Sequence, residues 1–316
     1  MRHGRYAPSP TGVLHLGNLR TALLAWLFAR SSGRAFTLRA EDLDRLRVRP
    51  GATSHMLADL RWLGLDWDEG PDVGGPLGPY FQSQREALYA AAFARLRAAS
   101  LVYPCYCARS ELARIASAPQ QEGRSESSPR YPGTCRDLTP AQRAKREAAG
   151  RRPSWRFRAP EGEIAFTDLL HGKISENVAA TVGDFIVCRS DGVFAYQLAV
   201  VVDDALMGVD QIVRGDDLLG STARQLALYD ALCYPHPVKY THVPLALDAT
   251  GARLAKRDVA TGLDALTAAG STAEEIVGAL AASCNLWPEG TPATPAQVLA
   301  VFDPAKILRT PSAISL

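Results

Sequence analysis

The chain has 316 residues, of which 47% are hydrophobic and 22% are charged, so it is long enough for two or three domains or for one domain with a large insertion. The formal net charge of +2 is too small to imply general attraction to nucleic acid, so any basic patch has to be local. No apolar run approaches the length of a membrane span and no signal-peptide core follows Met1. We therefore expect a cytoplasmic protein whose six cysteines are thiols or metal ligands.

The first hundred residues alternate between strand and helix patterns. They predict a strand at residues 5–7, a helix at about 19–30 and a second strand at 35–42, followed by helices at about 54–63 and 84–99. Strand, helix, strand, helix is the order of a parallel sheet with crossover helices.

The middle of the chain interrupts this alternation. It holds three cysteines around a polar stretch at residues 117–130, for which we expect no chemical role, and short strands and turns dominate from 154 to 192. The α/β pattern then returns in the strand DQIVRG and in a helix at 221–233. An α/β core split by an insertion explains this order. The expected parts are a first half of the core at 1–100, an inserted subdomain at 101–182, a second half at 183–245, and a short, mainly helical C-terminal region at 246–316.

A histidine between two glycines precedes the first helix. Gly12 and Gly17 have the spacing of a phosphate-binding loop, but Asn18 and Leu19 stand where such a loop needs lysine and then serine or threonine. A helix start exposes free N–H groups and a positive dipole end, which suit phosphate. His15 is therefore a candidate phosphate donor, and the alternative is a histidine that only caps the helix.

A second basic element lies late in the chain, in GARLAKRDVA. It carries Arg253, Lys256 and Arg257, and Lys256 is a candidate to neutralise charge on a departing pyrophosphate. A solvated basic loop is the alternative for this run considered alone. Together, the two elements resemble the HIGH and KMSKS signatures of class I aminoacyl-tRNA synthetases, at the two ends of a split α/β core.

Three longer blocks narrow the resemblance to the catalytic domain of glutamyl-tRNA synthetases. They are YAPSPTGVLHLGNLRTALLAWLFAR, LRAEDLDRLRVRPG and FAYQLAVVVDDALMGVDQIVRGDDLLGSTARQ, and the likeness runs from about Arg5 to Lys256. It implies a Rossmann-like core that binds ATP, with Mg²⁺ accompanying the nucleotide. His15 and Lys256 become the catalytic residues, and the ATP-binding set is His15, Gly17, Asn18 and Lys256. Ala255 stands where the signature has serine, which removes one potential phosphate donor.

The resemblance also implies a pocket for L-glutamate. This substrate carries two carboxylates and an ammonium group, so its site needs arginine and an acidic side chain. Arg5 and Arg214 suit the carboxylates, Glu41 suits the ammonium group, and Tyr196 is a neutral donor. The family's pocket maps onto Arg5, Ala7, Ser9, Glu41, Tyr196 and Arg214.

Acidic pairs complicate the interpretation of Arg214. An ion pair with Asp216 or Asp217 is the alternative to a role in substrate binding. The pairs Asp203–Asp204 and Asp216–Asp217 are interpreted as polar loop residues at strand ends, because no dedicated magnesium motif is visible.

The cysteines of the middle segment form a moderate metal signal, with buried reduced thiols as the alternative. Their spacing resembles the zinc site of truncated glutamyl-tRNA synthetase paralogues, in which a tyrosine is the fourth ligand. That likeness implies one structural zinc ion per chain, held by Cys105, Cys107, Tyr131 and Cys135. The other three cysteines, Cys188, Cys233 and Cys284, are expected to be core thiols.

About sixty residues follow Lys256, too few for the helical domains with which glutamyl-tRNA synthetases read the anticodon. A whole activation site, a zinc insertion and no anticodon-binding region resemble the glutamyl-queuosine tRNA(Asp) synthetases. The resemblance implies transfer of glutamate to queuosine at the wobble position, with the anticodon stem-loop of tRNA(Asp) as partner, no membrane partner and a monomeric chain. A shortened synthetase charging a tRNA 3′ end and a non-catalytic tRNA-binding module are the alternatives.

Overall fold

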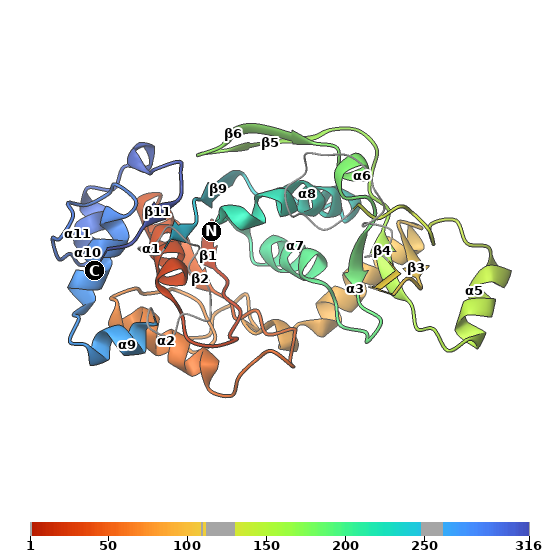
Figure 1. Cartoon of the computed structure of the whole chain (residues 1–316), viewed down its shortest axis with the longest axis horizontal. Coiled ribbons are helices and arrows are strands. Elements are labelled where there is room, and N and C mark those ends of the chain that lie inside the picture. Colours follow the sequence, from red (N-terminus) through yellow and green to blue (C-terminus); the bar gives the residue numbers. More distant parts are fainter. Residues whose placement is uncertain (1, 109, 112–129, 248–261, 316) are drawn as a thin grey trace.

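A six-stranded mixed sheet forms the centre of the computed structural model, which describes residues 2–108, 110–111, 130–247 and 262–315 (Figure 1). The strand order is β2-β1-β8-β9-β5-β6, in which the first five strands run parallel and β6 closes an antiparallel edge. The expected parallel core is thus present, with an antiparallel hairpin added at one side. Its strands are β1 (His3–Tyr6), β2 (Ala35–Leu38), β5 (Ile164–Asp168), β6 (Gly172–Glu176), β8 (Val209–Gly215) and β9 (Lys239–Val243).

The helix α1 (Leu16–Ser31) is buried on nearly every side, which explains its apolar sequence. It packs on β1 and β8 and also contacts α10 (Ala273–Ala282) and α11 (Pro295–Ala300) of the C-terminal region. The helix begins three residues earlier than predicted, so that His15 itself is the N-cap residue.

The other helices agree closely with the predicted segments where a segment was predicted. The second predicted strand is shorter than expected and ends at Leu38, although the backbone N–H groups of Arg39 and Glu41 still donate to Tyr6 and Pro8. The remaining helices are α2 (Ala52–Trp62), α3 (Glu86–Ala98), α5 (Pro140–Ala148), α6 (Val178–Thr181), α7 (Tyr196–Leu206), α8 (Thr222–Ala231) and α9 (Leu263–Ala268), with 3₁₀ helices η1 (Gln82–Gln84), η2 (Asp216–Ser221) and η4 (Pro304–Lys306).

A three-stranded antiparallel sheet lies beside α5, toward the end of the elongated molecule opposite α10 and α11 (Figure 1). It consists of β3 (Val102–Cys105), β4 (Ser154–Phe157) and β7 (Phe185–Cys188). Its hydrogen bonds cross the expected boundary at residue 182. The strand β7 comes from beyond that boundary, whereas the β5–β6 hairpin before it belongs to the central sheet.

The C-terminal region returns to the core. The short strands β10 (Ala246–Leu247) and β11 (Ser312–Ala313) pair in parallel, and Phe302 packs edge-on against Phe28 of α1 with ring centroids 5.2 Å apart. In the part of the chain that the structure describes, no helix has the length and apolar character needed to cross a bilayer.

Candidate active site

A cavity of about 660 Å³ opens at the carboxyl ends of β1 and β8. This edge of a parallel sheet is where α/β proteins usually bind ligands. Nine of the ten residues predicted for the catalytic, ATP and glutamate sites line it: Arg5, Ala7, Ser9, His15, Gly17, Asn18, Glu41, Tyr196 and Arg214. The tenth, Lys256, lies outside the described residues, as do Arg253, Ala255 and Arg257.

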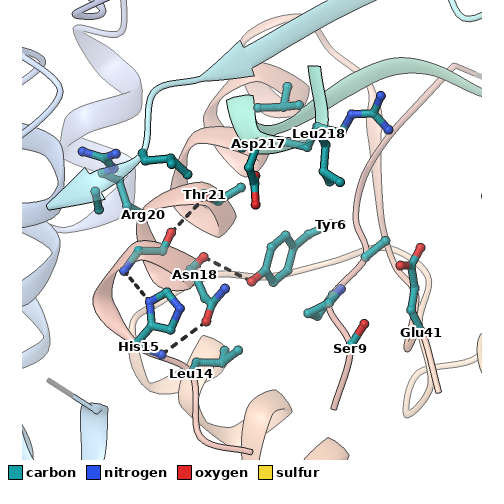
Figure 2. A pocket seen from close by; sticks show the side chains of 18 of the residues that line it. Tyr6, Ser9, Leu14, His15, Asn18, Arg20, Thr21, Glu41, Asp217 and Leu218 are labelled. Carbon is teal, nitrogen blue, oxygen red and sulfur yellow. Dashed lines mark hydrogen bonds between the residues drawn. The ribbon is translucent and has the colours of Figure 1, made fainter. Parts of the chain in front are cut away.

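His15 and Asn18 close the capping box of α1 at one side of the cavity. The His15 Nδ1 accepts a hydrogen bond of 3.1 Å from the backbone N–H of Gly17, and Asn18 Oδ1 accepts one of 3.4 Å from the His15 N–H. Figure 2 shows these two side chains across the cavity from Ser9 and Glu41, with Tyr6 between the two groups. The cavity therefore has a helix-start end and an acidic end.

The capping bond fixes the chemistry of the imidazole. Because Nδ1 accepts a hydrogen bond from the Gly17 N–H, the neutral ring carries its proton on Nε2, which can therefore donate. Gly17 leaves room for this ring position, since a Cβ there would lie only 3.0 Å from His15 Cε1. Capping and phosphate donation therefore use different nitrogens, and the two interpretations of His15 are compatible.

Arg5 is held beneath the cavity by a buried carboxylate. Its Nε and Nη2 atoms lie 3.3 and 3.2 Å from the two oxygens of Asp204, and Nη1 donates to the Val213 carbonyl. Asp204 also accepts from Arg39 at 2.7 Å, and Arg39 in turn donates to Glu41 at 3.1 Å. Burial alone raises the pKa of Asp204, but the two arginines outweigh it and hold that pKa below its ordinary value.

The interpretation of Asp203 and Asp204 as polar loop residues is wrong. Both lie on α7 and are fully or almost fully buried, and Asp203 accepts hydrogen bonds from Gln82, Arg85 and Tyr89. The sequence did contain a signal, because two carboxylates directly after an apolar run have to be paired if that helix is buried.

Arg214 is oriented by neutral partners. Its guanidinium donates to His242 Nε2 at 3.0 Å, to Gln225 Oε1 at 2.8 Å and to Thr222 Oγ1 at 2.9 Å. Among the described residues no carboxylate lies within ion-pair distance of this guanidinium, so the proposed pair with Asp216 or Asp217 is not present. Asp216 and Asp217 themselves lie in η2, directly after β8.

Behind Arg214 stands a second buried pair that the sequence did not reveal. The Asp168 carboxylate lies 2.7 Å from His242 Nδ1, which leaves Nε2 as the acceptor that Arg214 requires. Burial, the largest influence, lowers the pKa of His242 and keeps the ring neutral. Sheet register creates this relay, because Asp168 pairs with Tyr240, and Arg214 with His242, across three strands distant in sequence.

Glu41 and Tyr196 complete the acidic end of the cavity. Burial raises the pKa of Glu41 against the opposing influence of Arg39 and Arg5. A cationic group that binds in the cavity would therefore stabilise the charged form of this carboxylate. Burial also raises the pKa of Tyr196 and keeps this phenol a neutral donor.

The four predicted metal-ligating residues, which fall between positions 105 and 135 of the sequence, meet in one cluster. The Sγ atoms of Cys105, Cys107 and Cys135 come close enough to share one ion, and the Tyr131 hydroxyl lies 3.3 Å from Cys105 and 3.9 Å from Cys107. Arg156 donates to Cys105 Sγ at 3.3 Å and its guanidinium lies 3.7 Å over the Tyr131 ring. Hydrogen bonds from Cys135, Tyr131 and Arg156 hold the pKa of the Cys105 thiol below its ordinary value, whereas burial raises the pKa of the Tyr131 phenol.

The other cysteines are only partly as expected. Cys188 and Cys284 are buried, but Cys233 is exposed, so its prediction as a core thiol is wrong. The reason is local, because α8 ends at Ala231 and Cys233 adopts a left-handed φ of 50° as the chain turns away from the helix.

Comparison with known proteins defines the class. The family model of the class I tRNA synthetases (E and Q), catalytic domain, matches residues 2–282. A crystal structure of a glutamate tRNA ligase from Elizabethkingia meningosepticum, in complex with its amino acid, superposes with a TM-score of 0.83. It is 28% identical, and the match covers 99% of this chain and 67% of that one. The chain thus has the fold of a class I synthetase catalytic domain.

Curated relatives give the particular family. The glutamyl-Q tRNA(Asp) synthetase of Symbiobacterium thermophilum is 57% identical over 98% of this chain and 94% of its own length. The enzyme of the same name from Nocardia farcinica is 53% identical over 98% and 91%. Glutamate–tRNA ligase 1 of Halorhodospira halophila is 44% identical, with 98% of this chain matching 64% of that protein. The chain belongs to the glutamyl-Q tRNA(Asp) synthetase family.

Proposed function

We propose that this chain activates L-glutamate with ATP as glutamyl-adenylate and transfers the glutamyl group to queuosine at the wobble position of tRNA(Asp). The observation that carries the proposal is the single cavity that combines a histidine-capped helix start with Arg5, Arg214 and Glu41. Membership of the glutamyl-Q tRNA(Asp) synthetase family supports this acceptor over a tRNA 3′ end. We further propose that the chain acts as a monomer on the anticodon stem-loop.

The reaction needs no covalent nucleophile from the protein. A substrate carboxylate attacks the α-phosphorus of ATP, pyrophosphate leaves, and the enzyme orients the reactants and neutralises charge. In our proposal the His15 Nε2–H and the N–H groups at the start of α1 hold phosphate, with Gly17 and Asn18 beside them and Lys256 on the leaving group. Mg²⁺ accompanies the nucleotide.

Glutamate then occupies the end of the cavity opposite His15. Arg5 and Arg214 bind its carboxylates and Glu41 its ammonium group, while Tyr196 donates a hydrogen bond. Ala7 and Ser9 provide the adjoining wall. Buried hydrogen bonds orient both arginines, because Asp204 accepts from Arg5 and the His242–Asp168 pair accepts from Arg214.

Replacing Arg214 with alanine should raise the KM for glutamate roughly tenfold or more, because a hydrogen bond to a charged group typically contributes 1.5–3 kcal/mol. The KM for ATP should change little. Glutamate saturation of ATP–pyrophosphate exchange measures the effect, with Arg45→Ala as control because Arg45 is an exposed arginine paired with Glu86. Normal saturation by glutamate in the Arg214 variant would remove this residue from the proposed pocket.

The acceptor is tested with radiolabelled glutamate, ATP and tRNA(Asp) prepared with and without queuosine. The proposal predicts label only on the queuosine-containing tRNA, and that label should survive removal of the 3′ nucleotide. Label at the 3′ end of tRNA(Glu) would instead identify a shortened glutamyl-tRNA synthetase. No label on any tRNA, with pyrophosphate exchange intact, would mean that the activation is correct and the acceptor is not.

We also propose that Cys105, Cys107, Tyr131 and Cys135 hold one structural zinc ion. Zinc–sulfur bonds of 2.3 Å in a tetrahedral site separate two sulfur atoms by about 3.8 Å, and the Sγ atoms of Cys107 and Cys135 are 3.6 Å apart. A bound zinc would lock β3 to the segment around Tyr131. This ordering of the subdomain has no part in the chemistry of activation.

Changing Cys107 to serine should lower bound zinc by one equivalent per chain and reduce the melting temperature, since structural zinc contributes directly to folding. Metal analysis after gel filtration measures the loss. Cys233→Ser is the matched control, because that thiol is exposed and is not part of the cluster. Full zinc content in the Cys107 variant would mean that these cysteines are ordinary thiols.

A further inference from the structure

A second group of metal-ligating side chains lies away from the cavity lining, where α2 meets α9 (Figure 1). His55 and Asp59 are four residues apart on α2, a spacing that puts two side chains on the same helix face. Asp264 approaches from the first turn of α9. The His55 Nε2 lies 3.1 Å from Asp264 Oδ1 and 3.6 Å from Asp59 Oδ1.

We propose that His55, Asp59 and Asp264 form a binding site for a divalent transition-metal ion of the zinc type, which ties α9 to α2. Imidazole and carboxylate are common ligands for such ions, and metal bonds of 2.0–2.2 Å place neighbouring ligand atoms about 3.3 Å apart in a tetrahedral site. The observed separations bracket this value. The three donors leave a position open to water.

The state of Asp59 is an independent indication of a missing partner. Its residue is only 7% exposed, and its Oδ2 atom is buried with no hydrogen-bond partner in the part of the chain that the structure describes. A buried carboxylate oxygen without a partner is costly. With a neutral His55 the two carboxylates carry two negative charges, and one divalent cation balances them.

The position of the site connects it to the active site. Gly262, immediately before α9, forms a β-bridge with His15 at the start of α1. Asp264 is two residues further along, and Lys256 is only eight residues before it in the sequence. A metal ion between α2 and α9 therefore anchors the chain at the C-terminal side of the segment that carries Lys256.

Equilibrium dialysis of the full chain against micromolar Zn²⁺, followed by metal analysis, tests the site. The wild type should hold one equivalent more than His55→Ala or Asp264→Asn. In both variants the affinity of this site for Zn²⁺ should fall by at least about tenfold. Changing a residue that only supports a metal ligand commonly causes a loss of this size, so changing a ligand itself should cause no less. The proposed cysteine site does not affect this comparison, because it is intact in all three proteins.

His236→Ala is the matched control. His236 is 43% exposed, as His55 is, and it too lies beside an aspartate, Asp230, but no third ligand completes a cluster there in the described part of the chain. It should keep the full zinc content. Equal stoichiometry in wild type and His55→Ala, or extra binding only at millimolar Zn²⁺, would overturn the proposal.

Amide hydrogen exchange provides a second measurement of the link between the helices. Adding Zn²⁺ should slow exchange in residues 263–268 of the wild type and of Cys107→Ser, but not of His55→Ala. Slowing of the same extent in His55→Ala would show that zinc acts on α9 from somewhere else and would contradict the assignment.

Discussion

Replacing Asp204 with alanine should destabilise the protein by about 3–5 kcal/mol, the usual cost of removing one partner from a buried ion pair. The carboxylate is only 1% exposed and joins Arg5 to Arg39 beneath the cavity. Arg39 keeps Asp203 and Glu41 as neighbours, whereas Arg5 loses its only carboxylate in the described part of the chain. Urea unfolding measures the stability, and the KM for glutamate should rise with it.

Two further variants separate charge from shape. Asp204→Asn keeps the volume and removes the charge, so it should lose most of the same stability. Asp44→Ala removes a half-exposed carboxylate 3.5 Å from Arg189 and should cost no more than about 1 kcal/mol. If Asp204→Asn unfolds at the wild-type urea concentration, the ion pair is not what holds Arg5 in place.

Replacing Lys256 with alanine should lower the rate of ATP–pyrophosphate exchange by about a hundredfold or more, if this lysine stabilises charge that develops on the leaving group. Such an interaction strengthens in the transition state, so kcat should fall while the KM for glutamate changes little. Pyrophosphate exchange at saturating glutamate and ATP is the measurement.

The neighbouring Arg257 is the control for this prediction, because the resemblance to the KMSKS signature assigns the leaving-group role to Lys256 alone. Arg257→Ala should retain exchange within a few-fold of the wild type. An unchanged exchange rate in Lys256→Ala would remove the lysine from the mechanism, and an equal loss in both variants would indicate that the net charge of the segment matters more than one residue.

Local patterns were enough to predict much of the fold. The alternation of strand and helix in the first hundred residues predicted the parallel arrangement of β1 and β2 around α1. The antiparallel β5–β6 edge and the place of β7 in the small sheet were not predictable, because strand partners are determined by packing between segments far apart in sequence.

Sequence motifs predicted the residues that line the cavity, but they did not predict the residues that hold those side chains in place. His15 and Glu41 stand in sequence blocks that resemble those of a known family, and Arg5 directly precedes the first block, so all three could be named without a structure. Asp204 was misassigned, since the local sequence does not show that the helix is buried on the side that carries this carboxylate.

The sequence by itself predicted the class of enzyme, the cavity-lining residues and the residues that meet in the cysteine cluster, because each of these depends on side chains that stand in short, ordered motifs. Only the tertiary structure decided how Arg5 and Arg214 are held. Their partners, Asp204 and the His242–Asp168 pair, lie up to 199 residues away and reach them through helix packing and strand register. The meeting of His55 and Asp59 with Asp264 has the same origin, because side chains pair by position in space and not by distance along the chain.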